Sequence, residues 1–268
     1  MKLESPMSSC VFRPMPPLYV ILFFSVSLLQ CTTTSVGALG SETDRFALLK
    51  FKESISVDPH GILSSWNDST NNPFCSWPGI ACGSQDQRVT SLDLEGYKLQ
   101  GTISTHLGNL SSLSFINLQS NSFSGEIPQQ VGHLFGLQHF DLSDNILEGN
   151  IPVNLSYCSQ LRILSLRSNR LSGMIPYELG SLVKLEYLSL GTNNLTGGIP
   201  ASLGNISSLG QFSLAYNNLV GTVPHELGRL KSLTFFAIGP NNLFGTIPLS
   251  LYNMSFMNTF SITDNQFN

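Results

Sequence analysis

The chain of 268 residues has little charge and few long apolar runs. Only 11% of its residues are Asp, Glu, Lys or Arg, and the net charge is -4, so no basic stripe is available for a phosphate backbone. Its one long apolar run, from Leu18 to Leu29, covers 12 residues, well short of the about 20 that a membrane helix needs. We therefore expect no nucleic-acid partner and no membrane segment in the mature chain.

Signatures of catalysis are absent too. The sequence contains no GxGxxG, GxSxG, GxxxxGK or HExxH motif, which excludes the usual patterns of kinases, hydrolases, nucleotide-binding proteins and zinc proteases. The five histidines fall at unrelated positions and predict no metal site. From these residues we expect no enzyme, no cofactor and no bound metal.

The N-terminal segment has the composition of a targeting signal. Two basic residues, Lys2 and Arg13, precede the apolar run, and small residues follow it. This order is typical of a secretory signal peptide, which we expect over residues 1–38, with export of the chain through the secretory pathway. A short signal anchor and a lipidated Cys31 are the alternatives.

Cysteine is sparse, and only one close pair lies outside the expected signal. Cys75 and Cys82 stand in a loop rich in Pro, Asn and Ser. In an exported chain such a pair indicates a disulfide. Zinc is the competing interpretation, but a structural zinc site requires four ligands, and no second Cys or His pair is near in the sequence.

From Val89 to Phe256 the sequence repeats every 24 residues without insertion or deletion. Seven copies are complete, as in LEYLSLGTNNLTGGIPASLGNISS from Leu185, and an eighth begins at Met257. A fixed period of this length is the signature of a solenoid, in which each copy forms one turn and packs only against its neighbours. We assign residues 89–268 to this array.

Within each copy the fourth and sixth places are apolar, as at Leu164 and Leu166, and the places beside them are mostly polar. This alternation predicts a short strand with one buried face. Successive strands then form a parallel sheet. Because the return segments are bulkier than the strands, we expect the stack to curve, with the sheet on its concave side.

In every copy except the first, which has Tyr97 there, the ninth place is occupied by an asparagine. Its amide carries donors and an acceptor and can bond backbone groups of its own turn and of the next turn. Buried backbone groups without such a partner would cost about 1–3 kcal/mol per turn, so we interpret the column as structural. This predicted ladder consists of Asn121, Asn145, Asn169, Asn193, Asn217, Asn241 and Asn265.

A different pattern precedes the repeats. Apolar residues between Phe46 and Ile55 recur at roughly helical spacing, and Pro59 and Gly61 end that segment. A solenoid needs a cap that covers the apolar end of its first turn. We therefore expect a helical N-terminal cap over residues 41–88.

The pattern LxxLxLxxNxLxGxIPxxLGxL resembles the plant-specific class of leucine-rich repeats. ETDRFALLKFKESISVDPHGILSSW followed by FCSWPGIAC is similar to the N-terminal domain of plant leucine-rich-repeat receptor-like kinases, most of all the innate-immunity subfamily that includes the flagellin and elongation-factor receptors. The resemblance implies a right-handed leucine-rich-repeat solenoid of the α/β type. It also implies a Cys75–Cys82 cap disulfide and, in full-length relatives, a serine/threonine kinase domain that this sequence lacks.

The concave strands are the expected recognition surface, because side chains on a rigid scaffold are presented at fixed spacing. The third, fifth, seventh and eighth places of each copy should face that side. Aromatic residues and arginine on an open surface often anchor interfaces. The ligand-binding residues predicted on this basis are Phe115, His139, Asp141, Arg167, Tyr187, Gln211, Tyr216 and Phe235.

Asn-x-Ser/Thr sequons predict N-glycosylation of the exported chain. Several share the twenty-first place, on the return segment opposite the sheet, where glycans would leave the concave strands open; an equally good interpretation is that Leu-Gly-Asn fits that turn. Asn194 lies nearer to the strand end. The predicted sites are Asn67, Asn109, Asn154, Asn194, Asn205 and Asn253.

Three hypotheses for function follow. The first is the ligand-recognition region of a plant receptor-like kinase, extracellular or at the plasma membrane, which binds a peptide or protein ligand in defence signalling, with a leucine-rich-repeat co-receptor as a second partner. The second is a secreted inhibitor of cell-wall-degrading enzymes, since the repeats are also similar to polygalacturonase-inhibiting proteins. The third is a truncated product without autonomous function.

Overall fold

The computed structural model describes residues 36–67, 73–252 and 256–268. The expected signal peptide therefore lies outside the described residues except for its last three positions, and the sequon at Asn253 lies outside them as well. Helix α1 (Val36–Glu53) begins at those three positions, ahead of the residue where we expect the cap to start.

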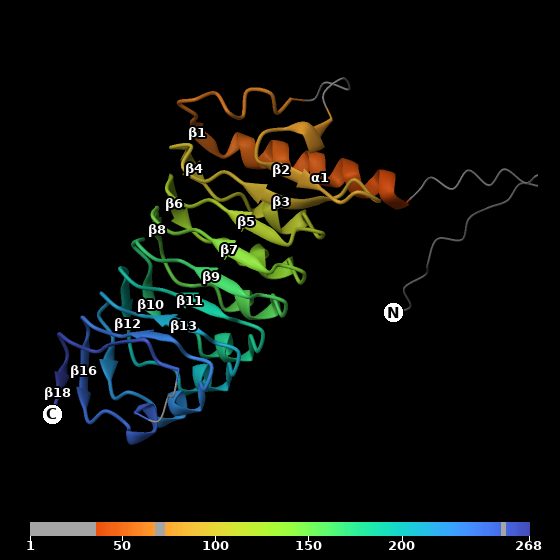
Figure 1. The fold of residues 1–268 in the computed structure, drawn as a ribbon. Helices are drawn as coiled ribbons and strands as arrows, with labels where there is room; N and C mark the ends of the chain where they lie inside the picture. The colour runs from red at the N-terminus through yellow and green to blue at the C-terminus, as the bar shows by residue number, and fades with distance from the viewer. Residues whose placement is uncertain (1–35, 68–72, 253–255) are drawn as a thin grey trace, which may run out of the picture. The chain divides into compact units, whose positions relative to one another are not determined.

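The N-terminal cap consists of α1, the short strand β1 (Ile55–Val57), the 3-10 turn η1 (Phe74–Ser76) and strand β2 (Ile80–Cys82). β2 pairs in antiparallel fashion with the first repeat strand, so that the cap adds one strand to the repeat sheet. β1 pairs in the same antiparallel sense with the first strand of a second sheet. The cap thus adds one strand to the main sheet and one to the first of the smaller sheets of the solenoid (Figure 1).

Eight parallel strands, one per turn, form the main sheet on the concave face (Figure 1). Their register advances by 24 residues from strand to strand, as the repeat predicts; for example, Leu164 lies opposite Leu188. The strands are β3 (Val89–Asp93), β5 (Phe115–Asn117), β7 (His139–Asp141), β9 (Ile163–Ser165), β11 (Tyr187–Ser189), β13 (Gln211–Ser213), β15 (Phe235–Ala237) and β17 (Thr259–Ser261).

A second set of short strands, which the sequence pattern did not predict, follows the asparagine of each turn. In the second to seventh turns these lateral strands end before the proline of the copy, where a backbone donor would be missing; the first turn has Ser104 at that place. They are β4 (Gln100–Thr102), β6 (Ser122–Glu126), β8 (Ile146–Glu148), β10 (Ser172–Met174), β12 (Asn194–Thr196), β14 (Val220–Gly221), β16 (Asn242–Gly245) and β18 (Gln266–Phe267).

The return segments form 3-10 helices that close each turn on the side away from the main sheet. Every one of them starts after a residue with extended backbone, which is a proline in all turns except the first. They are η2 (Thr105–Asn109), η3 (Gln129–His133), η4 (Val153–Tyr157), η5 (Tyr177–Ser181), η6 (Ala201–Asn205), η7 (His225–Arg229) and η8 (Leu249–Leu251).

The core runs through the stack as columns of like residues. Leucines and isoleucines of the strands and of the 3-10 helices are fully buried in successive turns. In the last turns the fourth place is aromatic, and the rings of Phe212, Phe236 and Phe260 stack with centroids 5.4 Å apart at both steps. Offset aromatic pairs of this kind add about 0.5–1.5 kcal/mol beyond the area that they bury.

Each ladder asparagine joins two turns, as Asn169 illustrates. Its side-chain oxygen accepts a hydrogen bond from the backbone N–H of Leu147 in the preceding turn (2.9 Å). Its amide nitrogen donates to the carbonyl of Leu142 in the preceding turn (2.9 Å) and to those of Leu166 and Arg167 in its own turn (3.2 and 3.3 Å). One side chain therefore supplies an acceptor to one backbone N–H and a donor to three backbone carbonyls. The Arg167 carbonyl also accepts from the Asp144 N–H, and the Leu142 and Leu166 carbonyls also accept from the neighbouring ladder asparagines.

Glycine at the twentieth place sets the spacing of the 3-10 helices. A Cβ on Gly108, Gly132, Gly180 or Gly204 would lie within 2.5 Å of a backbone carbonyl oxygen in the next turn. Ser156 occupies this place in the third turn, and there η4 and η5 pack less closely than the other neighbouring 3-10 helices. A serine side chain at this place occupies volume that a glycine leaves free for close approach.

We predict that Asn169→Ala lowers the free energy of unfolding by about 1–3 kcal/mol, because the Leu147 N–H loses its acceptor and three carbonyls each lose one of their two donors. Urea denaturation followed by circular dichroism measures the change. Asn218→Ala is the matched control, since this asparagine is exposed and its side chain makes none of the ladder bonds. Equal urea midpoints for wild type and Asn169→Ala would contradict the structural role that we assign to the ladder.

We further predict that Gly204→Ala destabilises the chain by about 1–3 kcal/mol, since its Cβ would meet the carbonyl of Glu226 at 2.4 Å. Gly136→Ala makes the same chemical change where no atom lies within 4 Å of the added Cβ. Thermal unfolding of the two variants checks this difference. If Gly204→Ala is as stable as Gly136→Ala, neighbouring 3-10 helices can move apart without loss of stability, and the prediction is wrong.

Candidate ligand-binding face

The register of the main sheet places the third-place side chains of all turns in one row across the concave face. Phe115 lies opposite His139, and Tyr187 lies opposite Gln211, which in turn lies opposite Phe235. Neighbouring side chains are therefore about 4.8 Å apart along the row, the spacing of paired strands. Most of them are half-buried, with their outer surfaces open to solvent.

At the N-terminal end of this row the rings of Phe115 and His139 are stacked, with centroids 4.3 Å apart and planes inclined by 22°. Burial lowers the pKa of His139 below its ordinary value of 6.5, and the negative charges of Asp141 and Asp93 oppose that shift without cancelling it. The stacked pair thus presents a flat, uncharged surface beside two carboxylates.

Asp141 and Arg167 are both held by neighbours. The Asp141 carboxylate accepts hydrogen bonds from the backbone N–H (2.8 Å) and the hydroxyl (2.5 Å) of Ser143. Arg167 donates from one guanidinium nitrogen to both carboxylate oxygens of Asp144, at 3.2 and 3.3 Å. Half of the Arg167 side chain is exposed, so this ion pair contributes little to stability, and its guanidinium stays available to a ligand.

Toward the C-terminal end, Arg167, Tyr216 and Phe235 line one hollow of about 420 Å³. The Tyr216 side chain is 63% exposed. Of the eight residues that the sequence predicts for ligand binding, the structure thus gathers three at this hollow and brings Phe115, His139 and Asp141 together at the other end. Tyr187 and Gln211 lie between the two groups, in the same row.

Other residues on this face were not among the predicted ones. Gly239, Pro240 and Asp264 line the same hollow as Tyr216. At the first turn, Asp93 and Glu95 line a second hollow of about 470 Å³. The one signal in the sequence was Pro240, which breaks the repeat pattern at the end of a strand. The remaining residues carry no pattern of their own.

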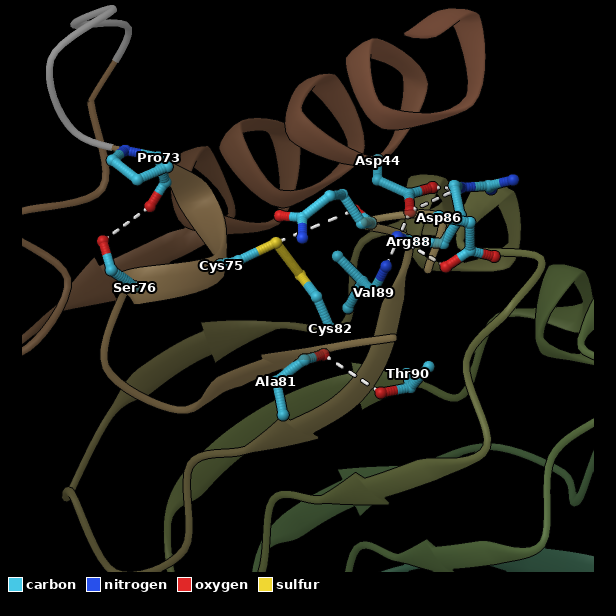
Figure 2. Close-up of a disulfide and its surroundings, with 11 residues drawn as sticks. Asp44, Pro73, Cys75, Ser76, Ala81, Cys82, Asp86, Arg88, Val89 and Thr90 are labelled. Atoms are coloured by element: carbon cyan, nitrogen blue, oxygen red, sulfur yellow. Dashed lines mark hydrogen bonds and ion pairs between the residues drawn. A yellow bond between two sulfur atoms is a disulfide. The ribbon is translucent and has the colours of Figure 1, made fainter. Parts of the chain in front are cut away.

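The cap holds the N-terminal end of the face in place. Cys75 and Cys82 form a disulfide with a Cα–Cα distance of 5.6 Å, which joins η1 to β2 (Figure 2). From α1 the fully buried Asp44 carboxylate accepts two bonds from the Arg88 guanidinium and one from the N–H of Val89, all at 2.8 Å (Figure 2). The helix is therefore tied directly to β3.

The described sequon asparagines lie on or near the surface. Asn109, Asn154 and Asn205 belong to η2, η4 and η6, on the side opposite the main sheet, while Asn194 begins lateral strand β12. Among the residues that the structure describes, no group of His, Cys, Asp and Glu is arranged to hold a metal ion. The same residues include no helix long and apolar enough to cross a membrane.

Residues 41–83 match the family described as Leucine rich repeat N-terminal domain, and residues 112–134, 136–158, 160–182 and 184–206 match the family Leucine Rich Repeat. The LRR receptor-like serine/threonine-protein kinase EFR of Arabidopsis thaliana is 48% identical over 112 residues, which are 41% of this chain and 11% of that protein. The chain thus matches about a tenth of the length of this curated relative.

Solved structures show the same similarity. A chain in the crystal structure of PEPR1-AtPEP1 has a TM-score of 0.81 at 32% identity, over 84% of this chain and 32% of that chain. A chain in the crystal structure of the BIR3 - SERK2 complex from Arabidopsis thaliana has a TM-score of 0.58 at 36% identity, over 65% of this chain and 93% of that chain. Both are similar in fold and in sequence.

We predict a pH dependence that comes from His139. Because its pKa is lowered in the folded state, the unfolded chain takes up a proton more readily below pH 6.5. The stability present above this pH is therefore partly lost as the pH falls from 6.5 toward the folded pKa. In His139→Gln that loss disappears, which urea denaturation at pH 7.5 and at pH 5.5 measures. His60→Gln is the control, since it removes a histidine from another part of the chain. If His139→Gln loses as much free energy of unfolding between pH 7.5 and pH 5.5 as the wild type does, the prediction is wrong.

Proposed function

This chain belongs to the plant leucine-rich-repeat family that includes receptor-kinase ectodomains, and on that premise we propose that it recognises a peptide or protein ligand on its concave face. The observation that carries the proposal is the row of third-place side chains. These residues differ from turn to turn, while the places around them are fixed by the core and by the ladder. Variable side chains on a rigid frame are what a recognition surface requires.

The residues of the face suit a peptide. Aromatic rings at Phe115, Tyr187, Tyr216 and Phe235 offer rigid apolar contacts, and Arg167 offers a bidentate partner for a carboxylate. Eight strands make the face roughly 35 Å wide, which an extended peptide of about ten residues would span. The sequons Asn109, Asn154 and Asn205 lie on the opposite side, so glycans attached there would leave the face open.

The relatives support the same role. The PEPR1 structure contains AtPEP1 as its partner, and the BIR3 structure is a complex with SERK2. We infer that this chain acts outside the cell or at the cell surface after export through the secretory pathway. Within a longer receptor it would act at the plasma membrane, in defence signalling, with a second leucine-rich-repeat protein as co-receptor.

The experiment that tests this function is selection of peptides on the secreted chain from a display library of about 12 random residues, a length that spans the face. Tyr187→Ala, in the middle of the row, should weaken the selected peptides about tenfold or more in interferometry, as the loss of a buried aromatic anchor does. Tyr177→Ala is the matched control, because this tyrosine is 69% exposed on η5, away from the main sheet.

Two results would contradict the proposed function. One is a library from which no peptide is enriched. The other is a set of enriched peptides that bind Tyr187→Ala as tightly as wild type and lose affinity for Tyr177→Ala, since the recognition surface would then lie on the side of the 3-10 helices.

A further inference from the structure

A second row of backbone hydrogen bonds runs along the edge of the concave face, beyond the strands. In each turn the N–H of the eighth place donates to the carbonyl of the seventh place in the next turn. These bonds are Gly96 to Gln119 (2.9 Å), Ser120 to Ser143 (3.0 Å), Asp144 to Arg167 (2.9 Å), Ser168 to Gly191 (2.9 Å) and Thr192 to Ala215 (2.8 Å).

The row breaks between the sixth and seventh turns. The next bond would run from the N–H of Tyr216 to the carbonyl of Gly239, and the structure has no such bond. Beyond it, Pro240 has no N–H to donate. On both sides of the gap the neighbouring bonds are intact, from Leu214 to Ala237 (2.8 Å) and from Asn217 to Pro240 (3.3 Å). Two successive bonds of the row are therefore missing. The Thr263 carbonyl, which would accept from the eighth place of the seventh turn, keeps a bond from the Asn265 amide (3.3 Å).

The ladder asparagine of this turn does not compensate. Six of the ladder asparagines donate to the seventh-place carbonyl of their own turn. Asn241 bonds the carbonyls of Leu214 and Ile238 but not that of Gly239. Within residues 73–252 and 256–268, neither the Tyr216 N–H nor the Gly239 carbonyl has a hydrogen-bond partner.

Both groups belong to residues that line the hollow of about 420 Å³ on the concave face. Phe235, Arg167 and Asp264 line the same hollow, so it offers an aromatic ring and one charge of each sign. Tyr216 and Pro240 also line a second hollow of about 400 Å³ at the edge, next to Asn194 and Asn218. Tyr216 and Pro240 thus line both hollows, and Gly239 lines the one on the concave face.

A donor and an acceptor on neighbouring turns match the main chain of an extended peptide. One residue of a strand presents its N–H and its C=O on the same side and can exchange two hydrogen bonds with a facing partner. Peptide recognition by added strands relies on main-chain bonds of this type for affinity and on adjacent pockets for specificity. A sugar or another small molecule would not require this pairing of groups.

We propose that the Tyr216 N–H and the Gly239 carbonyl form a main-chain anchor for an extended peptide ligand. One ligand residue accepts from Tyr216 and donates to Gly239, and the rings of Tyr216 and Phe235 pack against the side chains beside it. This proposal rests on the proposed function and narrows it, since it assigns the ligand backbone to the sixth and seventh turns.

The test uses the secreted chain and peptides selected on it from the random library. Each residue of a selected peptide is N-methylated in turn, which removes one backbone donor. We expect one position at which N-methylation weakens binding about tenfold, the scale of one well-formed hydrogen bond. Hydrogen exchange supplies a second readout: without peptide the Tyr216 amide should exchange faster than the Thr192 amide, and bound peptide should protect it.

Two variants test whether the peptide affinity and the exchange at Tyr216 depend on the missing bond between Tyr216 and Gly239. Pro240→Ser restores an N–H and gives the seventh turn the residue found at this place in Ser120 and Ser168. The restored N–H would donate to the Thr263 carbonyl, as that of Ser168 donates to Gly191. With the seventh turn in the backbone conformation of the other turns, the Gly239 carbonyl accepts from Tyr216 again, so exchange at Tyr216 slows without peptide and the selected peptides bind about tenfold more weakly. Pro224→Ser makes the same change before η7, away from the main sheet, and should leave binding unchanged.

The outcomes separate the anchor from the proposed function. Peptides that lose affinity at one N-methylated position and protect Tyr216 support the anchor. If peptides bind and depend on Tyr187, yet the N-methyl scan is flat and Tyr216 stays unprotected, the anchor is wrong and the recognition function stands. If Pro240→Ser leaves exchange at Tyr216 unchanged, this variant has not closed the gap. The N-methyl scan on the wild-type chain then decides whether the anchor exists. Failure to select any peptide overturns both.

Discussion

The hydrogen bonds of the ladder asparagines are the constraint on which the rest of this structure depends. Each turn bends sharply after its strand, and there backbone groups such as the Leu147 N–H and the Leu142 carbonyl have an asparagine side chain as their partner. The amide of Asn169, like those of its counterparts, supplies both a donor and an acceptor and reaches two turns at once. Because unpaired buried groups are costly, the spacing of neighbouring turns is held fixed at this edge.

Fixed spacing separates the residues that maintain the fold from those free to recognise a ligand. Places four, six and nine are committed to the core and the ladder, as the burial of Leu164, Leu166 and Asn193 shows. The third place faces outward in every turn and carries Ser, Phe, His, Ile, Tyr, Gln or Thr without disturbing the stack. The seventh turn departs from this division, since Gly239 and Pro240 interrupt the backbone bonds next to the most exposed aromatic ring of the face.

The two ends of each turn are held by different physical means. On the return side, close approach of the 3-10 helices depends on glycine, and the step with a serine at that place is packed less closely. At the start of the stack, the buried Asp44 is satisfied by the Arg88 guanidinium and by a backbone N–H of the first repeat strand. A buried carboxylate without such partners would be strongly unfavourable, so the cap and the first turn are stable only together.

The sequence by itself determined the repeat length, the buried columns, the parallel sheet and the cap helix, because each depends on residue spacing within a single turn. It also predicted which places face the concave side, and the structure gathers Arg167, Tyr216 and Phe235 at one hollow. The lateral strands, the stack of Phe115 on His139 and the gap between Tyr216 and Gly239 were decided only by the tertiary structure. These features depend on distances and hydrogen-bond directions between residues one turn apart, which a one-dimensional pattern does not contain.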